Sequence, residues 1–180
     1  MQRFLKWAAL ASLVLPTVAS QAAPISYSES VDGDLPPFDP VPTFTFDIGV
    51  NTVSGSISLI LPDVDFDAFA FVVPAGLQVT SGSATLVDVA GDVSSAKWQL
   101  HAGSDQLYNG TPVKLLDISS PGSDTIPALG SNTYNLSPHE MGQRADNSTA
   151  NYTFTFNVIP EPASLSLLAL GSVALLRRRR

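Results

Sequence analysis

Three aspartates at alternate positions are the group in this 180-residue chain whose spacing most suggests chemistry. Asp63, Asp65 and Asp67 are separated by Val64 and Phe66, so in an extended backbone the three carboxylates face the same side. Carboxylate oxygens are preferred ligands of Ca²⁺, which takes about six to eight of them. The favoured interpretation is a solvated acidic strand end that discourages edge-to-edge pairing. The alternative is a calcium site that recruits further oxygens from elsewhere in the fold.

The segment that begins at Asp63 starts like an EF-hand loop but does not continue like one. Its sixth position is Ala68, where the loop needs glycine, and its twelfth is Pro74, where the loop needs glutamate. An EF-hand is therefore excluded, and calcium is the sole cofactor that the sequence suggests.

The residues that usually carry catalysis are sparse. His101 and His139 stand singly, without the close spacing of a zinc site. Ser104 and Asp105 follow His101, but neighbouring residues at a strand end point apart, and the chain has no cysteine and no G-x-S-x-G motif. Carboxylate pairs for glycoside hydrolysis could come from distant positions, as in any acidic fold. We expect a protein that is not an enzyme, and a secreted hydrolase is the less favoured alternative.

The C-terminal segment has three distinct parts. It contains the tripeptide Pro160, Glu161 and Pro162, an apolar run over 163–176, and the terminal residues Arg177, Arg178, Arg179 and Arg180. The prolines fix the backbone in a stiff, extended form. The apolar run is shorter than the about 20 residues that span a bilayer. The arginines would keep their end on the cytoplasmic side of the membrane. The segment predicts a short transmembrane helix at 163–176.

This order of parts resembles the PEP-CTERM sorting signal of Gram-negative bacteria, over residues 158–180. The resemblance implies that an exosortase recognises and processes the tail. It also implies an exported, transiently membrane-anchored protein that ends at the cell surface or in the extracellular matrix, in association with exopolysaccharide or biofilm. A plain single-span anchor with a proline-bracketed stalk is the alternative.

The N-terminus has the pattern of an export signal. Basic residues precede the apolar run 7–14, and small residues follow it. We predict a signal peptide over 1–22, cleaved by signal peptidase between Ala22 and Ala23. Cleavage after Ala19 is the competing choice, and a buried N-terminal helix is the structural alternative.

The chain between the two ends is strongly acidic. Residues 23–160 hold three basic and fifteen acidic residues, which leaves a net charge of about −12. Such a charge repels phosphate backbones, so we expect no nucleic-acid partner.

Short alternating or apolar runs, divided by turn residues, fill most of this region. Residues 23–42 are rich in proline and predict an extended arm, and residues 43–158 predict one antiparallel β-sandwich or jelly roll of about nine strands. The expected strands are Thr43–Ile48, Val53–Leu61, Asp67–Val73, Leu77–Thr80, Ala84–Val89, Ala96–His101, Val113–Ile118, Asn132–Leu136 and Asn151–Val158. The expected core residues are Phe44, Phe46, Ile57, Leu59, Phe69, Phe71, Trp98 and Phe154.

Residues 63–76, with their opening D-x-D and closing Pro-Ala-Gly, look like the bacterial pre-peptidase C-terminal domain, a jelly-roll accessory module. That resemblance implies a fold only. The alternative function is a calcium-dependent or carbohydrate-binding adhesive module. For sugar binding, Trp98, Tyr108 or Tyr134 could stack on sugar rings, although aromatic residues on strands are more often core.

Overall fold

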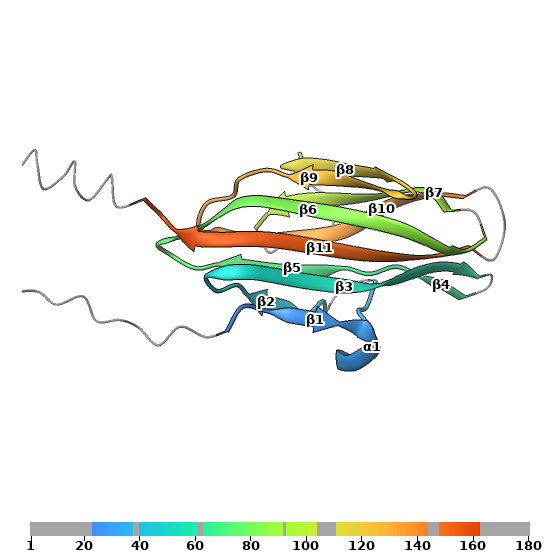
Figure 1. Ribbon diagram of the computed structural model, residues 1–180, viewed down its shortest axis with the longest axis horizontal. Coiled ribbons are helices and arrows are strands. Elements are labelled where there is room, and N and C mark those ends of the chain that lie inside the picture. Colours follow the sequence, from blue (N-terminus) through green and yellow to red (C-terminus); the bar gives the residue numbers. More distant parts are fainter. Residues whose placement is uncertain are drawn as a thin grey trace, which may run out of the picture.

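The computed structural model describes residues 23–37, 40–60, 63–91, 93–103, 111–143 and 148–162. In these residues the chain forms two β-sheets packed face to face, which confirms the all-β sandwich prediction (Figure 1). The expected signal peptide, the apolar run 163–176 and the terminal arginines lie outside the described residues. Within the described part of the chain, no helix has the length and apolar character to cross a membrane.

The first sheet has the strand order β1-β3-β11-β6-β9, and β4 pairs with β3 outside this path. Its strands are β1 (Ser26–Ser28), β3 (Gly49–Ile60), β4 (Asp63–Asp65), β6 (Leu77–Ala90), β9 (Gly122–Ile126) and β11 (Ser148–Pro160). The one short helix of the described residues, α1 (Glu29–Asp32), follows β1.

The second sheet has the order β2-β5-β10-β7-β8. Its strands are β2 (Thr43–Thr45), β5 (Phe69–Val73), β7 (Val93–Ala102), β8 (Lys114–Ser119) and β10 (Asn132–Gln143). Most neighbours are antiparallel, but β1 and β3 are parallel, as are β2 and β5. The two parallel pairs make both sheets of the predicted sandwich mixed rather than wholly antiparallel. Between β1 and β3 the chain passes through β2 in the other sheet, and it returns in its original direction.

Strand β11 supplies much of the core. Tyr152, Phe154, Phe156 and Val158 are buried, while the residues between them are partly exposed, so the predicted alternation is confirmed. The inward rings of β11 contact the second sheet: Phe154 lies 5.3 Å from Trp98, and Phe156 lies 4.8 Å from Phe71.

Most of the expected core residues are buried. These are Phe46, Ile57, Phe69, Phe71, Trp98 and Phe154. Phe44 is partly buried against the core, and the side chain of Leu59 lies outside the described residues.

Strand β6 is continuous, although the sequence predicted two strands with a turn between them. Gly82 and its neighbours suggested the turn, but Gly82 pairs with Phe156 of β11 and with Ile126 of β9. A Cβ added at Gly82 would lie 2.7 Å from the carbonyl oxygen of Thr155 and 3.0 Å from Cβ of Ile126. The glycine therefore permits a close approach within the sheet.

Residues 23–42 are also not the extended arm that the sequence predicted. They contain β1 and α1, and Leu35 is 1% exposed. The backbone N–H of Ile25 donates to the side chain of the buried Asn51 at 2.9 Å. These elements are too short for a periodic pattern, which is why the prolines dominated the prediction.

Strand β9 was missed because its sequence, GSDTI, is mostly polar. Asp124 of β9 accepts a hydrogen bond from the backbone N–H of Asp117 on β8 at 3.2 Å and lies 3.2 Å from Nζ of Lys114. Partial burial would raise the pKa of Asp124, but hydrogen bonds from the Thr125 and Asp117 N–H groups and the Lys114 charge together hold it below its usual value.

Replacing Gly82 by alanine should destabilise the sandwich by about 1–3 kcal/mol, because the new methyl group would press on the backbone of β11. Denaturant unfolding of both variants would measure this effect. Gly130→Ala is the matched control, since nothing lies within 4 Å of its added Cβ. Equal unfolding free energies for the two variants would contradict close packing at Gly82.

Asp124→Ala should lower the free energy of unfolding at pH 7 by about 1 kcal/mol. Because the folded-state pKa is depressed, this contribution is present above the unfolded pKa of about 4 and disappears as pH falls through the folded value. Unfolding curves at pH 7 and pH 3 would test this. Asp117→Ala is the control, because its more exposed carboxylate lies 3.9 Å from Lys97. A difference between wild type and Asp124→Ala that is unchanged at pH 3 would refute the assignment.

Candidate functional site

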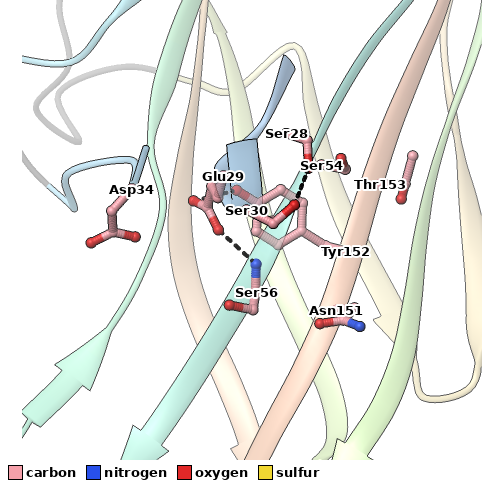
Figure 2. Close-up of a pocket in the computed structure, with 10 residues that line it drawn as sticks. Ser28, Glu29, Ser30, Asp34, Ser54, Ser56, Asn151, Tyr152 and Thr153 are labelled. Carbon is pink, nitrogen blue, oxygen red and sulfur yellow. Dashed lines mark hydrogen bonds between the residues drawn. The ribbon is translucent and has the colours of Figure 1, made fainter. Parts of the chain in front are cut away.

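A polar cavity of about 510 Å³ opens where α1 meets β3 and β11 (Figure 2). Hydroxyl, carboxyl and amide groups dominate its lining. The lining residues are Ser28, Glu29, Ser30, Asp34, Ser54, Gly55, Ser56, Asn151, Tyr152 and Thr153.

Glu29 fastens α1 to the first sheet. Its Oε2 accepts a hydrogen bond from the backbone N–H of Ser56 at 2.7 Å, as Figure 2 shows. Its Oε1 accepts from the hydroxyl of Tyr152 and from the N–H of Leu35, both at 3.2 Å. Gly55 makes this approach possible, because a Cβ there would collide with the carboxylate of Glu29. Glu29 therefore joins three segments that are distant in sequence.

Asp67 lies beneath this contact. It is 1% exposed, and neither of its carboxylate oxygens has a hydrogen-bond partner among the described residues. The next residue, Ala68, donates its N–H to the carbonyl of Pro36 at 3.2 Å, which holds the segment after α1 against the start of β5. One carboxylate oxygen from each of Glu29, Asp34 and Asp67 lies within 4.8 Å of the other two. We call these three residues the carboxylate cluster.

The electrostatics of the carboxylate cluster are unfavourable for three negative charges. Burial, reinforced by the charges of Glu29 and Asp65, raises the pKa of Asp67 to about 9. Burial, reinforced by Asp34 and Glu29, raises the pKa of Asp65 to about 6. Burial, reinforced by the charges of Asp67 and Glu29, also raises the pKa of Tyr152, so its hydroxyl remains a hydrogen-bond donor.

The expected trio of Asp63, Asp65 and Asp67 does not stand on one strand. Strand β4 ends at Asp65, and Asp67 follows in a non-strand segment. Asp67 instead joins Glu29 and Asp34, while the side chain of Asp63 lies outside the described residues. Glu29 and Asp34 were missed because they lie in the proline-rich segment, and no local spacing links them to Asp67.

The two histidines are bridged by one amide. The Nε2–H of His101 donates to Oε1 of Gln99 at 2.9 Å, and Nε2 of Gln99 donates to Nδ1 of His139 at 3.0 Å. Burial lowers the pKa of His101, which favours its neutral form. Ser104 and Asp105 lie outside the described residues.

The candidate sugar-stacking aromatics are not surface platforms where the structure describes them. Trp98 is 1% exposed and Tyr134 is 6% exposed, so both belong to the core. Tyr108 lies outside the described residues.

The tripeptide of the tail is continuous with the sandwich. Pro160 is the last residue of β11 and is paired with Leu77, and the N–H of Glu161 donates to the carbonyl of Gly76 at 2.8 Å. Pro160, Glu161 and Pro162 are all exposed. The described N-terminal and C-terminal ends leave the same end of the sandwich (Figure 1).

Comparison with solved structures finds several similar β-folds. The PliG periplasmic inhibitor of g-type lysozyme from Aeromonas hydrophila is 13% identical with a TM-score of 0.39, and covers 66% of this chain and 96% of its own. PliG from Salmonella Typhimurium is 14% identical with a TM-score of 0.30, and covers 66% and 98%. A structure of Bacillus endospore appendages, described as disulfide-linked pili, is 12% identical with a TM-score of 0.33, and covers 62% and 86%.

With TM-scores of 0.39, 0.33 and 0.30, these likenesses indicate no function for this chain. They are not pre-peptidase C-terminal domains, so that resemblance remains a prediction. The search of curated proteins finds no match.

The family comparison matches residues 158–180 and describes them as the PEP-CTERM protein-sorting motif. The match includes the exposed tripeptide that ends β11. This chain therefore carries a PEP-CTERM sorting motif at its C-terminus, which implies an exported protein that an exosortase processes.

Proposed function

We propose that this chain is a non-catalytic cell-surface or extracellular-matrix protein, delivered through its PEP-CTERM tail and associated with exopolysaccharide. The observation that carries the proposal is the match of residues 158–180 to the sorting motif. We further propose that signal peptidase cuts between Ala22 and Ala23, which would leave intact the contact between Ile25 and Asn51. The predicted route ends with the apolar run 163–176 leaving the membrane after processing.

The geometry of the tripeptide supports its role as a protease substrate. Proteases usually receive an extended backbone, and Pro160, Glu161 and Pro162 are exposed directly after an extended strand. The backbone hydrogen bond from Glu161 to Gly76 would have to open for an enzyme to bind Glu161. Breaking one exposed hydrogen bond costs about 1 kcal/mol, so the folded sandwich need not unfold for processing.

The absence of catalysis is also a proposal, and two arrangements support it. The carboxylate of Glu29 is occupied by three hydrogen bonds that hold the fold together. Asp67, although its raised pKa would suit a general acid, does not line the cavity. A sugar or peptide held in the cavity would therefore contact the lining residues rather than Asp67.

The mass of the protein recovered from its native host should correspond to a chain that begins at Ala23 and ends near Pro160–Pro162. Intact-mass spectrometry of the cell-surface and medium fractions would measure this. A mass that retains Arg180 in all fractions would contradict processing and indicate that the tail is a plain membrane anchor.

A pair of variants would separate sorting from stability in the same experiment. Glu161→Ala should leave the full tail in place and hold the protein in the membrane fraction. Ile159→Ala changes an exposed residue at the end of β11, just before the tripeptide, and should be processed normally. If both variants are processed equally, the processing enzyme does not recognise the Glu161 side chain.

A carbohydrate-binding adhesive module is the second candidate, and the hydroxyl-rich cavity favours it. Side chains such as Ser54, Asn151 and Thr153 offer both donors and acceptors, as sugar hydroxyls require. Because Trp98 and Tyr134 are buried, binding would depend on hydrogen bonds rather than on these rings.

If this second candidate is correct, Asn151→Ala should weaken co-sedimentation with exopolysaccharide from the host at least about tenfold, a loss of about 1.4 kcal/mol. Thr125→Ala, on the remote edge strand β9, should bind like the wild type. Wild-type protein that fails to sediment with the polysaccharide would reject the candidate and leave the sorting proposal untouched.

A further inference from the structure

No lysine or arginine side chain that the structure describes pairs with the carboxylate cluster. Among the described residues, the lysine and arginine side chains are Lys97 on β7 and Lys114 on β8. Strand β8 is the edge of the second sheet opposite to β2. Lys114 lies 3.2 Å from Asp124, and Lys97 lies 3.9 Å from Asp117. Neither ammonium group therefore neutralises Glu29, Asp34 or Asp67.

Asp67 makes this cluster more than an exposed acidic patch. Its side chain is 1% exposed, both oxygens lack a hydrogen-bond partner among the described residues, and one oxygen lies within 4.8 Å of oxygens from Glu29 and Asp34. A buried carboxyl group without any partner is costly, because burial removes the water that would otherwise bind it. A ligand at the centre of the cluster would relieve this cost.

The spacing and chemistry of the donors restrict the ligand. Two oxygens bound to the same Ca²⁺ at about 2.3–2.6 Å can be at most about 5 Å apart, and the cluster satisfies this limit. All donors are oxygens, which favours a hard cation over a transition metal. Oε2 of Glu29 accepts one hydrogen bond and retains lone-pair capacity.

We propose that Glu29, Asp34 and Asp67 together bind one hard divalent cation, with Ca²⁺ as the best fit. The ion is reached from the cavity, which Glu29 and Asp34 line and where Asp34 is exposed. Asp67 is the interior ligand, and water completes the coordination on the cavity side. The ion fastens the segment that carries α1 onto the sandwich, because its ligands come from both sides of that contact. This inference concerns the sandwich and is independent of the fate of the tail.

The competing state is a cluster in which Asp67 retains a proton and no ion binds. Replacing the aspartates of the cluster by asparagine should affect the two states differently. Asp67→Asn imitates the neutral acid in shape and should leave the metal-free fold stable, but it removes a charged ligand. Asp34→Asn changes an exposed residue and should fold normally while weakening the ion site.

The test uses the full chain in detergent, stripped with EDTA and titrated with CaCl₂ and separately with MgCl₂ at pH 7.5. Calorimetry should give one ion per chain, and Tm should rise by roughly 8 °C when the free ion is about 100-fold above Kd. Asp34→Asn should bind at least about tenfold more weakly, and Asp67→Asn should lose the Tm response. Asp117→Asn, a surface acid on β8, is the control and should respond like the wild type.

A response to either ion that Asp34→Asn weakens, Asp67→Asn loses and Asp117→Asn retains supports the proposal. A wild-type Tm that does not respond to either ion would overturn it in favour of the protonated state. A response of equal size in all four proteins would also overturn it, because binding would then occur elsewhere.

Discussion

Strand β11 has to be buried on one face for this sandwich to exist. It lies between β3 and β6, and its inward side chains meet the aromatic residues of the second sheet. Burying a large apolar side chain contributes about 1.5–3 kcal/mol, and Tyr152, Phe154, Phe156 and Val158 do so in succession. Without cysteine, the chain has no covalent alternative to this core. The edge strands β1 and β9 can be short or polar because β11 and its two neighbours already form a stable centre.

Tyr152 connects this core to the acidic site. Its ring packs 5.7 Å from Trp98, while its hydroxyl donates to Glu29 on α1. The N-terminal segment is therefore attached here through polar contacts, in addition to the apolar contact that Leu35 makes with the core. Such an attachment depends on how well the buried carboxyl groups are satisfied, because an unsatisfied one opposes docking of the whole segment. Asp67 is the residue on which this balance depends.

The sequence predicted the features that depend on local pattern. The alternation in β11 and in β3 was visible because large and small or polar residues take turns over many positions. The sorting tail was visible because its three parts are contiguous, and the family comparison confirms that prediction. In both cases the relevant residues are neighbours along the chain.

The features that depend on distant contacts were not predictable in this way. From the sequence alone, Gly82 predicts a turn. Its role in a continuous strand follows only from the close approach of the β11 backbone. The polar segment β9 is a strand because it pairs with β6, and β1 is a strand because it pairs with β3. The carboxylate cluster joins Glu29 and Asp34 to Asp67 across more than thirty positions of sequence, so Asp67 was selected with Asp63 and Asp65 instead.

The continuity of β11 with Pro160 and Glu161 has a mechanical consequence. A force applied to the tail along the strand axis would load the ladders with β3 and β6 together, since β11 is paired on both sides over most of its length. Bonds loaded in this shear geometry must fail nearly at once, whereas bonds at a peeled edge fail one after another. A membrane enzyme that pulls on Pro162 would thus extract the tail against a body that resists extension, and the sandwich would remain folded during its own release.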